Sequence, residues 1–351
     1  MHPHIRPSRS LARRALALGA SVALTVGLAA CGSDSAVGSG TANVTDPELR
    51  ELVEAAQQEG TLTLYGVPDE AVLQALGDRF TELYGVEVEP VRLVSADLSQ
   101  RFSSEADSGA PASDAILLTH SPFFGDALDK DWLTPVSEAG IPDYPGSYPE
   151  EYLERDGDVP VVSLVQTSMV YNTDAVSQAP TSWQAYADPA YRGKLAIADP
   201  ATSPANLAFW QLMRDEYGDD FLRAIAENNP SWQNSAVPGT QAVAAGEAVL
   251  GHPGVEAIVR NLRDSGAPVD TTVPGPSTGP EIALGLTGNS EHPNAAKLFA
   301  HFVLSEEGST LLAEESGAGS PYGTNLTEGF ARPERVSPEQ EKAITQLLGT
   351  E

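Results

Sequence analysis

The sequence contains one cysteine, Cys31, among 351 residues. A single thiol forms no internal disulfide, and without a second sulfur nearby it is a poor start for a zinc or iron–sulfur site. Basic residues are also few, with 20 lysines and arginines against 49 aspartates and glutamates. Four of the basic residues and none of the acidic ones lie in residues 1–30, so the remaining chain carries a formal net charge of −33. Such a surface repels nucleic acid and anionic membranes, and we expect no nucleic-acid binding.

Long apolar runs are lacking after residue 30, so no later segment reaches the roughly 20 residues that a membrane-spanning helix needs. Residues 1–30 place four arginines before an uncharged stretch, residues 15–30, which ends in small residues. This layout is typical of a secretory signal peptide, and we expect residues 1–30 to be cleaved. The pair Arg13 and Arg14 leaves open whether export follows the general or the twin-arginine route.

The four residues Leu-Ala-Ala-Cys that end at Cys31 resemble the lipobox of bacterial lipoproteins. The resemblance implies that Cys31 is lipidated and becomes the first residue of the mature chain. Residues 31–44 consist mostly of glycine, serine, alanine and threonine, a composition that buries no core and predicts a flexible tether. Its root-mean-square reach of roughly 20 Å would hold a domain just clear of the membrane, either outside the cytoplasmic membrane or in a periplasm.

The chain beyond the tether alternates between predicted strands and helices. A strand at "TLTLYG", a helix over residues 68–85 and a strand at "VEVEPVRLV" form a βαβ unit, which implies a parallel sheet. Further strands are predicted at "DAILLT", "VPVVSLVQ", "SMVYN" and "KLAIADP", with helices near residues 98–108 and 122–130, around "SWQAYADP" and over "SPANLAFWQLMRDEYG". The 321 residues after position 30 exceed the roughly 250 to 300 that one core serves, so an α/β protein of two lobes is expected.

Several of these phrases together resemble the ferric-iron and phosphonate-type solute-binding proteins of ABC importers. "LTLYG" with "RFTELYGVEVEPV" is similar to that group's opening strand and helix, and "SMVYNTDAV" through "KLAIADP" to the stretch after its first lobe. "QAVAAGEAVLG" and "EHPNAAKLFAHFVLSEEGSTLL" resemble its late helices, so the similarity spans residues 62–312. The resemblance implies the type II periplasmic-binding-protein fold, in which a hinge closes two α/β lobes over a ligand in the cleft between them.

The resemblance also sets the expected domains and partners. Lobe 1 would comprise residues 45–168 and 281–330, lobe 2 residues 169–280, and residues 331–351 a C-terminal helix that packs on the lobes. The implied partners are a small solute, the membrane subunits of an ABC permease, and the membrane itself through the lipid anchor. We expect a monomer with no cofactor.

The sequence departs from the pattern of this group at the residues that bind iron. In the ferric-ion binders of this group, two adjacent tyrosines follow the "GE" helix and strand, because phenolate oxygen suits Fe(III). Here "GEAVLGHPG" places His252, Pro253 and Gly254 at that point, and "YGVPDE" after the first strand carries no histidine. The usual iron site is therefore lacking and we expect no metal, with iron held by non-standard ligands as the alternative.

Two groups of polar residues each end a predicted strand and precede a predicted helix. Helix N-termini present free backbone N–H groups, and hydroxyls add donors, so both groups suit an anion such as a phosphonate, sugar phosphate or carboxylate. Plain helix capping is the alternative for each residue. The groups are Thr119, His120 and Ser121, and Thr202, Ser203 and Asn206.

Three further residues are candidates for contact with an organic ligand. Tyr65 ends the first predicted strand and Tyr171 lies near the expected crossover between lobes, and each has core packing as its alternative. His252 occupies the position of the group's ligand residues, with a space-filling role in a turn as its alternative.

Two other classes of protein remain as alternatives. A secreted cell-envelope enzyme is one, but the sequence contains no H-E-x-x-H motif, and we expect no catalysis. A surface adhesin is the other, and it would need an exposed apolar patch rather than a polar cleft.

Overall fold

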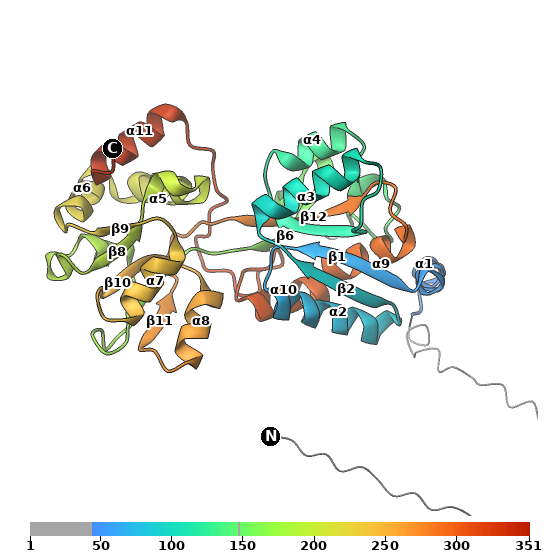
Figure 1. The fold of residues 1–351 in the computed structure, drawn as a ribbon, viewed down its shortest axis with the longest axis horizontal. Coiled ribbons are helices and arrows are strands. Elements are labelled where there is room, and N and C mark those ends of the chain that lie inside the picture. Colours follow the sequence, from blue (N-terminus) through green and yellow to red (C-terminus); the bar gives the residue numbers. More distant parts are fainter. Residues whose placement is uncertain (1–43, 147) are drawn as a thin grey trace, which may run out of the picture. The chain divides into compact units, whose positions relative to one another are not determined.

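The computed structural model describes residues 44–146 and 148–351. Strands in this part of the chain form two sheets, and helices cover both faces of each (Figure 1). The predicted signal peptide, Cys31 and residues 32–43 of the predicted tether lie outside the described residues. The expected α/β class is confirmed.

The first sheet is built from β1 (Thr61–Gly66), β2 (Glu87–Arg92), β3 (Ala115–Thr119), β4 (Leu133–Thr134), β5 (Leu153–Glu154), β6 (Val159–Leu164) and β12 (Glu281–Thr287). Its order is β2-β1-β3-β12-β6-β5, with β4 paired to β12. β1 runs parallel to β2 and β3, as the predicted βαβ unit requires, whereas β12 runs antiparallel to β3 and β6. β12 follows the strands of the second sheet in the chain, so the first sheet is completed only by this late return.

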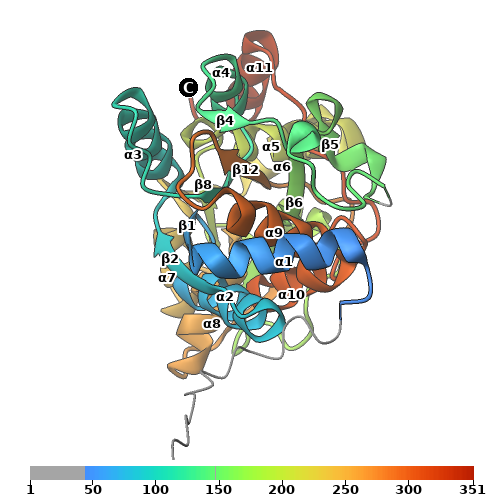
Figure 2. The same ribbon diagram turned by 90° about the vertical axis from the view of Figure 1, so that its right-hand side faces the viewer.

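Helices cover the first sheet according to the alternation of its side chains. Leu62 and Leu64 of β1 pack in one core, and Tyr65 packs in the core on the opposite face, because successive strand residues point to opposite faces. The first of these faces carries α1 (Pro47–Glu59), α2 (Glu70–Tyr84), α9 (Pro293–Leu304) and α10 (Glu306–Ser316) (Figure 2). The other face carries α3 (Ser95–Asp107) and α4 (Phe123–Asp129).

The second sheet is built from β7 (Ser168–Asn172), β8 (Leu195–Ala198), β9 (Ser231–Gln233), β10 (Leu250–Gly254) and β11 (Val269–Thr272). Its order is β11-β7-β10-β8-β9. β8 runs parallel to β9 and β10, and β7 runs antiparallel to β10 and β11. The carboxyl ends of β8, β9 and β10 therefore meet at one edge of this sheet.

Two groups of helices cover the second sheet (Figure 1). One face carries α5 (Pro204–Tyr217), α6 (Asp219–Glu227) and α11 (Pro338–Leu348), and the other carries α7 (Ala236–Ala244) and α8 (Glu256–Asp264). The helix predicted around "SWQAYADP" is instead two short 3₁₀ turns, Trp183–Ala187 and Pro189–Tyr191. Asp188 separates them, because its side chain accepts a hydrogen bond from Ala190 N (2.9 Å) and the proline that follows has no N–H to continue a helix.

Within the described chain, three segments that pass between the sheets are hydrogen-bonded side by side. They are residues 165–167, 275–280 and 328–332. Ser277, in the middle segment, donates its hydroxyl to Thr167 O (2.9 Å), and its carbonyl accepts from Ala331 N (2.7 Å). Ser277 is completely buried, so these bonds form away from water.

Glycines allow these three segments to approach so closely. A Cβ atom at position 279 would lie 2.0 Å from Val165 O, and one at position 275 would lie 2.8 Å from Glu328 O. Both distances are below any tolerated contact with a backbone atom. Gly275 and Gly279 are therefore required for the chain segments to lie side by side.

The C-terminal helix α11 completes the core of the second sheet. It follows the third segment, contacts α5 and α6, and buries Ile344 and Leu348 among the side chains of that core. A capping box at Ser337 and Gln340 fixes its start. The last residues of the chain thus belong structurally to the sheet that begins at residue 168.

His252 also lies in this core rather than at an exposed edge. It is on β10 with 1% of its surface exposed, and its ring centroid is 4.1 Å from that of Phe209 and 5.1 Å from that of Trp210. Neither ring nitrogen has a hydrogen-bond partner in the described part of the chain. Burial lowers the pKa of His252 to about 3, because the apolar surroundings disfavour the charged ring.

Removing the Ile344 side chain beyond Cβ should test the anchoring of α11. We expect Ile344→Ala to lower the free energy of unfolding by about 2–4 kcal/mol, because it leaves a cavity between α11 and the core. Denaturant unfolding measures the change. The exposed Gln346 on the same helix supplies a control, and Gln346→Ala should stay within about 0.5 kcal/mol of the wild type. Equal losses for the two variants would contradict the packing of α11 described above.

The buried His252 predicts a dependence of stability on pH. Between about pH 6.5 and 3 the unfolded chain binds a proton at this residue that the folded chain does not, so acid lowers the free energy of unfolding across that window. The slope approaches roughly 1.4 kcal/mol per pH unit for one such group. We expect His252→Phe, which keeps an apolar ring, to remove this contribution. Denaturant unfolding at several pH values measures this contribution. If the free energies of unfolding of the two proteins change in parallel with pH, His252 makes no such contribution.

Candidate functional site

The carboxyl end of β3 brings several predicted site residues together. Thr119 ends the strand, and its hydroxyl is 2.8 Å from that of Ser95 at the start of α3. His120 N donates to the backbone carbonyl of Glu281 (2.8 Å), and its ring Nδ1 lies 3.9 Å from Glu281 Oε2. Ser121 forms the turn that leads into α4, since its carbonyl accepts from Phe124 N. We call Ser95, Thr119, His120, Ser121 and Glu281 the first-sheet edge.

Glu281 is the acidic member of the first-sheet edge, and its charge is already compensated. Its side chain is 4% exposed, and its two oxygens accept from Arg332 Nε (2.6 Å) and Nη2 (2.8 Å). A buried carboxylate is stable only with such partners. The polar groups that this edge presents to solvent are therefore the partly exposed His120 ring and the hydroxyls beside it.

Tyr65 is the next-to-last residue of β1, and its side chain lies in the core beneath α3 rather than at the first-sheet edge. Its ring is 1% exposed with the Arg101 guanidinium 4.6 Å from its centroid, and its hydroxyl lies 3.1 Å from Glu105 Oε1. Burial and the neighbouring Glu105 charge raise the pKa of Tyr65 to about 12. Tyr65 therefore has the packed position and satisfied hydroxyl of a core tyrosine.

The second group of predicted residues lies together after β8. Ser203 caps α5 by accepting from Asn206 N (3.1 Å). Asn206 Nδ2 donates to Thr202 Oγ1 (2.9 Å), whose hydroxyl donates to Asp199 O (2.6 Å). Thr202 is exposed, whereas Asn206 is buried. We call Asp199, Thr202, Ser203 and Asn206 the second-sheet edge.

Residues that the sequence reasoning did not single out extend both edges. Val94, directly before α3, and Val237, in the first turn of α7, are the only exposed large apolar side chains in the described residues, at 45% and 44%. Gln233 ends β9 and its carbonyl accepts from Asp199 N of the second-sheet edge (2.8 Å), and Ser235 lies between β9 and α7. The polar run "WQNS" before a helix was the available signal for the latter pair, whereas no sequence pattern marks an exposed valine.

Tyr171 and His252 are not brought to either edge. Tyr171 lies in the middle of β7, where it pairs with Leu250 and Asp270, and 8% of it is exposed. Burial raises its pKa, with the Asp270 charge adding to the effect. Both side chains contribute to the core of the second sheet.

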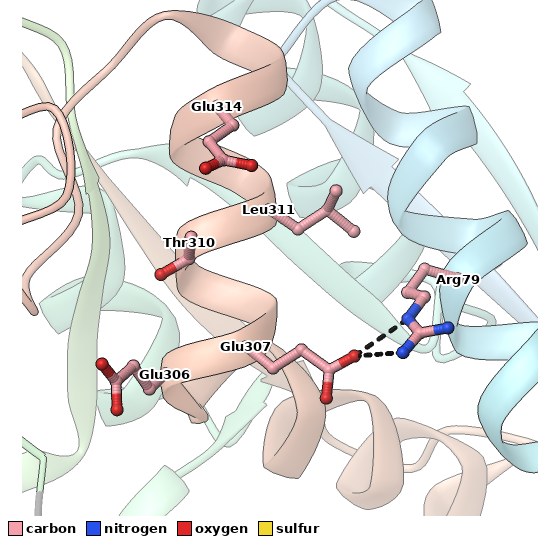
Figure 3. Close-up of a pocket in the computed structure, with 6 residues that line it drawn as sticks. All are labelled: Arg79, Glu306, Glu307, Thr310, Leu311 and Glu314. Atoms are coloured by element: carbon pink, nitrogen blue, oxygen red, sulfur yellow. Dashed lines mark hydrogen bonds and ion pairs between the residues drawn. The ribbon is translucent and has the colours of Figure 1, made fainter.

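A surface groove of about 450 Å³ lies elsewhere, between α2 and α10 (Figure 3). Arg79 reaches across it and donates to Glu307 through Nε (2.9 Å) and Nη2 (2.6 Å). Three glutamates of α10 line the groove, none of the predicted ligand residues does, and the ion pair is partly exposed. Its main effect is to join α2 to α10, with a contribution of about 0–1 kcal/mol.

Residues 44–146 and 148–351 contain neither a candidate metal cluster nor a membrane-spanning helix. No group of three or more histidine, cysteine, aspartate or glutamate side chains there is arranged to hold a metal ion. No helix of those residues has the length and apolar character needed to cross a bilayer.

Known proteins with similar sequence include one curated relative. An uncharacterized protein of Haemophilus influenzae is 25% identical over 292 residues, which covers 78% of this chain and 81% of the relative.

Solved structures share the fold. Iron-bound HitA from Pseudomonas aeruginosa superimposes with a TM-score of 0.55 at 19% identity, over 83% of this chain and 97% of HitA. The periplasmic binding protein AfuA from Actinobacillus pleuropneumoniae, with fructose-6-phosphate bound, gives a TM-score of 0.52 at 19% identity, over 83% of this chain and 97% of AfuA. At such identities the likeness concerns the fold alone, and it confirms the expected two-lobe periplasmic-binding-protein fold.

The sequence also matches a family model, that of the bacterial extracellular solute-binding protein, over residues 66–310. The match covers more than half of the chain, including both edges described above. The suspected family is confirmed, and this chain belongs to the bacterial extracellular solute-binding proteins.

Proposed function

We propose that this protein captures a small organic anion outside the cytoplasm and delivers it to the permease of an ABC importer. The observation that carries the proposal is the set of polar groups on the two edges. One edge has the His120 ring with its neighbouring hydroxyls, and the other has the exposed hydroxyl of Thr202, which would turn its hydrogen from Asp199 O to the solute. Phosphonates, sugar phosphates and carboxylates are the classes that such donors bind.

Helix N-termini add to these donors. α3 begins after Val94 and α7 begins after Ser235, and neither residue caps its helix through a side-chain hydrogen bond in the described structure. The first backbone N–H groups of both helices therefore remain free to donate to a bound anion, which the helix dipole also favours.

The two exposed valines favour an organic solute over a bare ion. Val94 and Val237 lie at these same helix starts, one on each edge. Apolar side chains left in water at a binding edge gain free energy when the solute covers them. An anion with an aliphatic or sugar portion fits such an edge better than inorganic phosphate does.

Ferric iron is the alternative within the family, since HitA carries iron on the same fold. Iron(III) prefers phenolate oxygen, which requires a deprotonated tyrosine. Burial raises the pKa of Tyr65 and of Tyr171, and His252 at the expected tyrosine position lies in the core. These features disfavour iron as the cargo.

The proposal includes a lipid anchor at Cys31, followed by the glycine- and serine-rich tether. One acyl chain alone anchors a protein only marginally, so the anchor would carry more than one. Attachment to the membrane would keep the captured solute near its permease.

Ligand-induced stabilisation should identify the solute class. We expect one of methylphosphonate, glucose 6-phosphate and succinate to raise the melting temperature of the domain from residue 45 onward, with about 2.7 kcal/mol gained at 100 times the dissociation constant. Spermidine and ferric nitrilotriacetate serve as the cationic and iron probes. Stabilisation by either of these, with no anion effective, would overturn the proposed ligand class.

Substitutions at the edges should weaken the same binding. His120→Ala and Thr202→Val each remove a donor to an anion, and we expect each to raise the dissociation constant roughly tenfold or more. Thr181→Val is the matched control, because Thr181 is exposed and lies before the Trp183–Ala187 turn rather than at the second-sheet edge. Calorimetry measures all three, and unchanged affinity in the edge variants would place the solute elsewhere.

Substitution of Cys31 should abolish membrane attachment and leave solute binding unchanged. Cys31→Ala is expected to move the exported protein from the membrane fraction to the medium or periplasm, because the only thiol of the chain is then gone. Fractionation followed by immunoblotting measures the shift, and solute affinity should not change. Retention in the membrane fraction would argue against lipidation.

A further inference from the structure

Arg332 connects the first-sheet edge to the segments that pass between the sheets. Besides its two bonds to Glu281, its Nη2 lies 2.5 Å from Glu154 Oε1 and its Nη1 donates to Glu151 O (2.5 Å). The neighbouring Ala331 is bonded to Ser277, which holds the backbone of this segment in place. Arg332 is thus fixed from both its backbone and its side chain.

The geometry matters because Glu281 is otherwise an unfavourable neighbour for an anion. Its carboxylate lies 3.9 Å from the His120 ring and is 4% exposed. Because Glu281 is buried and His120 is only partly exposed, charges at this position interact more strongly than they do in water. The planar guanidinium engages both oxygens of Glu281, and a lysine could not reproduce that fork.

We propose that Arg332 sets the charge preference of the solute by neutralising Glu281 at the first-sheet edge. This inference rests on the proposed function, which puts the bound solute against His120. With Arg332 present, the edge offers donors to an anion. Without it, Glu281 is a free carboxylate beside His120, repels an anion and attracts a cation, so the preference reverses.

Four variants test this role. Arg332→Met removes the compensating charge, Glu281→Gln removes the carboxylate, and the double variant removes both. Arg335→Met is the matched control, since Arg335 is exposed, lies three residues after Arg332 and makes no ion pair with the described residues. Calorimetry at pH 8 with glucose 6-phosphate, methylphosphonate and spermidine gives the ratio of cation to anion affinity for each protein.

We expect Arg332→Met to shift this ratio at least tenfold toward spermidine. Glu281→Gln should shift it toward the anions, because it removes a negative charge beside His120. Arg335→Met should leave it within threefold of the wild type, and the double variant, in which the two charge changes cancel, should return to that range. Restoration by the second substitution is the result that a merely structural role of Arg332 would not produce. A ratio unchanged in Arg332→Met, or not restored in the double variant, overturns the inference.

Folding and the proposed function are judged separately. Arg332→Met leaves a buried, unpaired carboxylate, so melting temperatures are recorded for every variant. If Arg332→Met does not fold, the double variant still tests the proposal. A folded double variant that no longer binds the anion probes would show that Arg332 does not act through Glu281. Wild-type protein that binds spermidine alone contradicts the proposed function, whereas wild-type protein that binds an anion, with the ratio unchanged in Arg332→Met, contradicts only the role of Arg332. Binding of none of the three probes overturns both.

Discussion

The fold depends on the backbone contacts among the three segments that pass between the sheets. Ser277 bonds to the segments on either side of it, and Gly279 allows the chain at Val165 to approach within a distance that no side chain would permit. Any relative motion of the two sheets has to be absorbed in these segments or at their ends, as in hinge closure. In the described chain, the proposed solute site also adjoins these segments, because β12 begins with Glu281 directly after the middle segment.

Charge poses the second constraint on this protein. A chain with a formal net charge of −29 repels anions at long range, but salt screens that repulsion beyond about 8–10 Å. The proposed capture of an anion would then depend on short-range donors: hydroxyls, a histidine ring and the backbone N–H groups at helix starts. Such uncharged donors bind without adding positive groups to the surface, and a nearby carboxylate has to be compensated locally, as Arg332 compensates Glu281.

Local features were predictable from the sequence, and long-range partners were not. The strand pattern of β1 to β3 and the serine cap at Ser203 follow from periodicity and capping chemistry, which act within a few residues. The contacts of Tyr65 with Glu105 and of His120 with Glu281 join residues 40 and 161 positions apart, and no local pattern encodes them. His252 was predicted to contact the ligand or to fill a turn, yet β10 continues through it and turns the ring inward.

The chain order of the two cores has a consequence for biosynthesis. The first sheet needs β12, and the second core needs Ile344 and Leu348 near the end of the chain. A polypeptide that emerges from its N-terminus first can close neither core until nearly all of it has been made. Neither core is complete while the chain is being synthesised, so a chain that crossed a membrane during synthesis would do so before either core had closed.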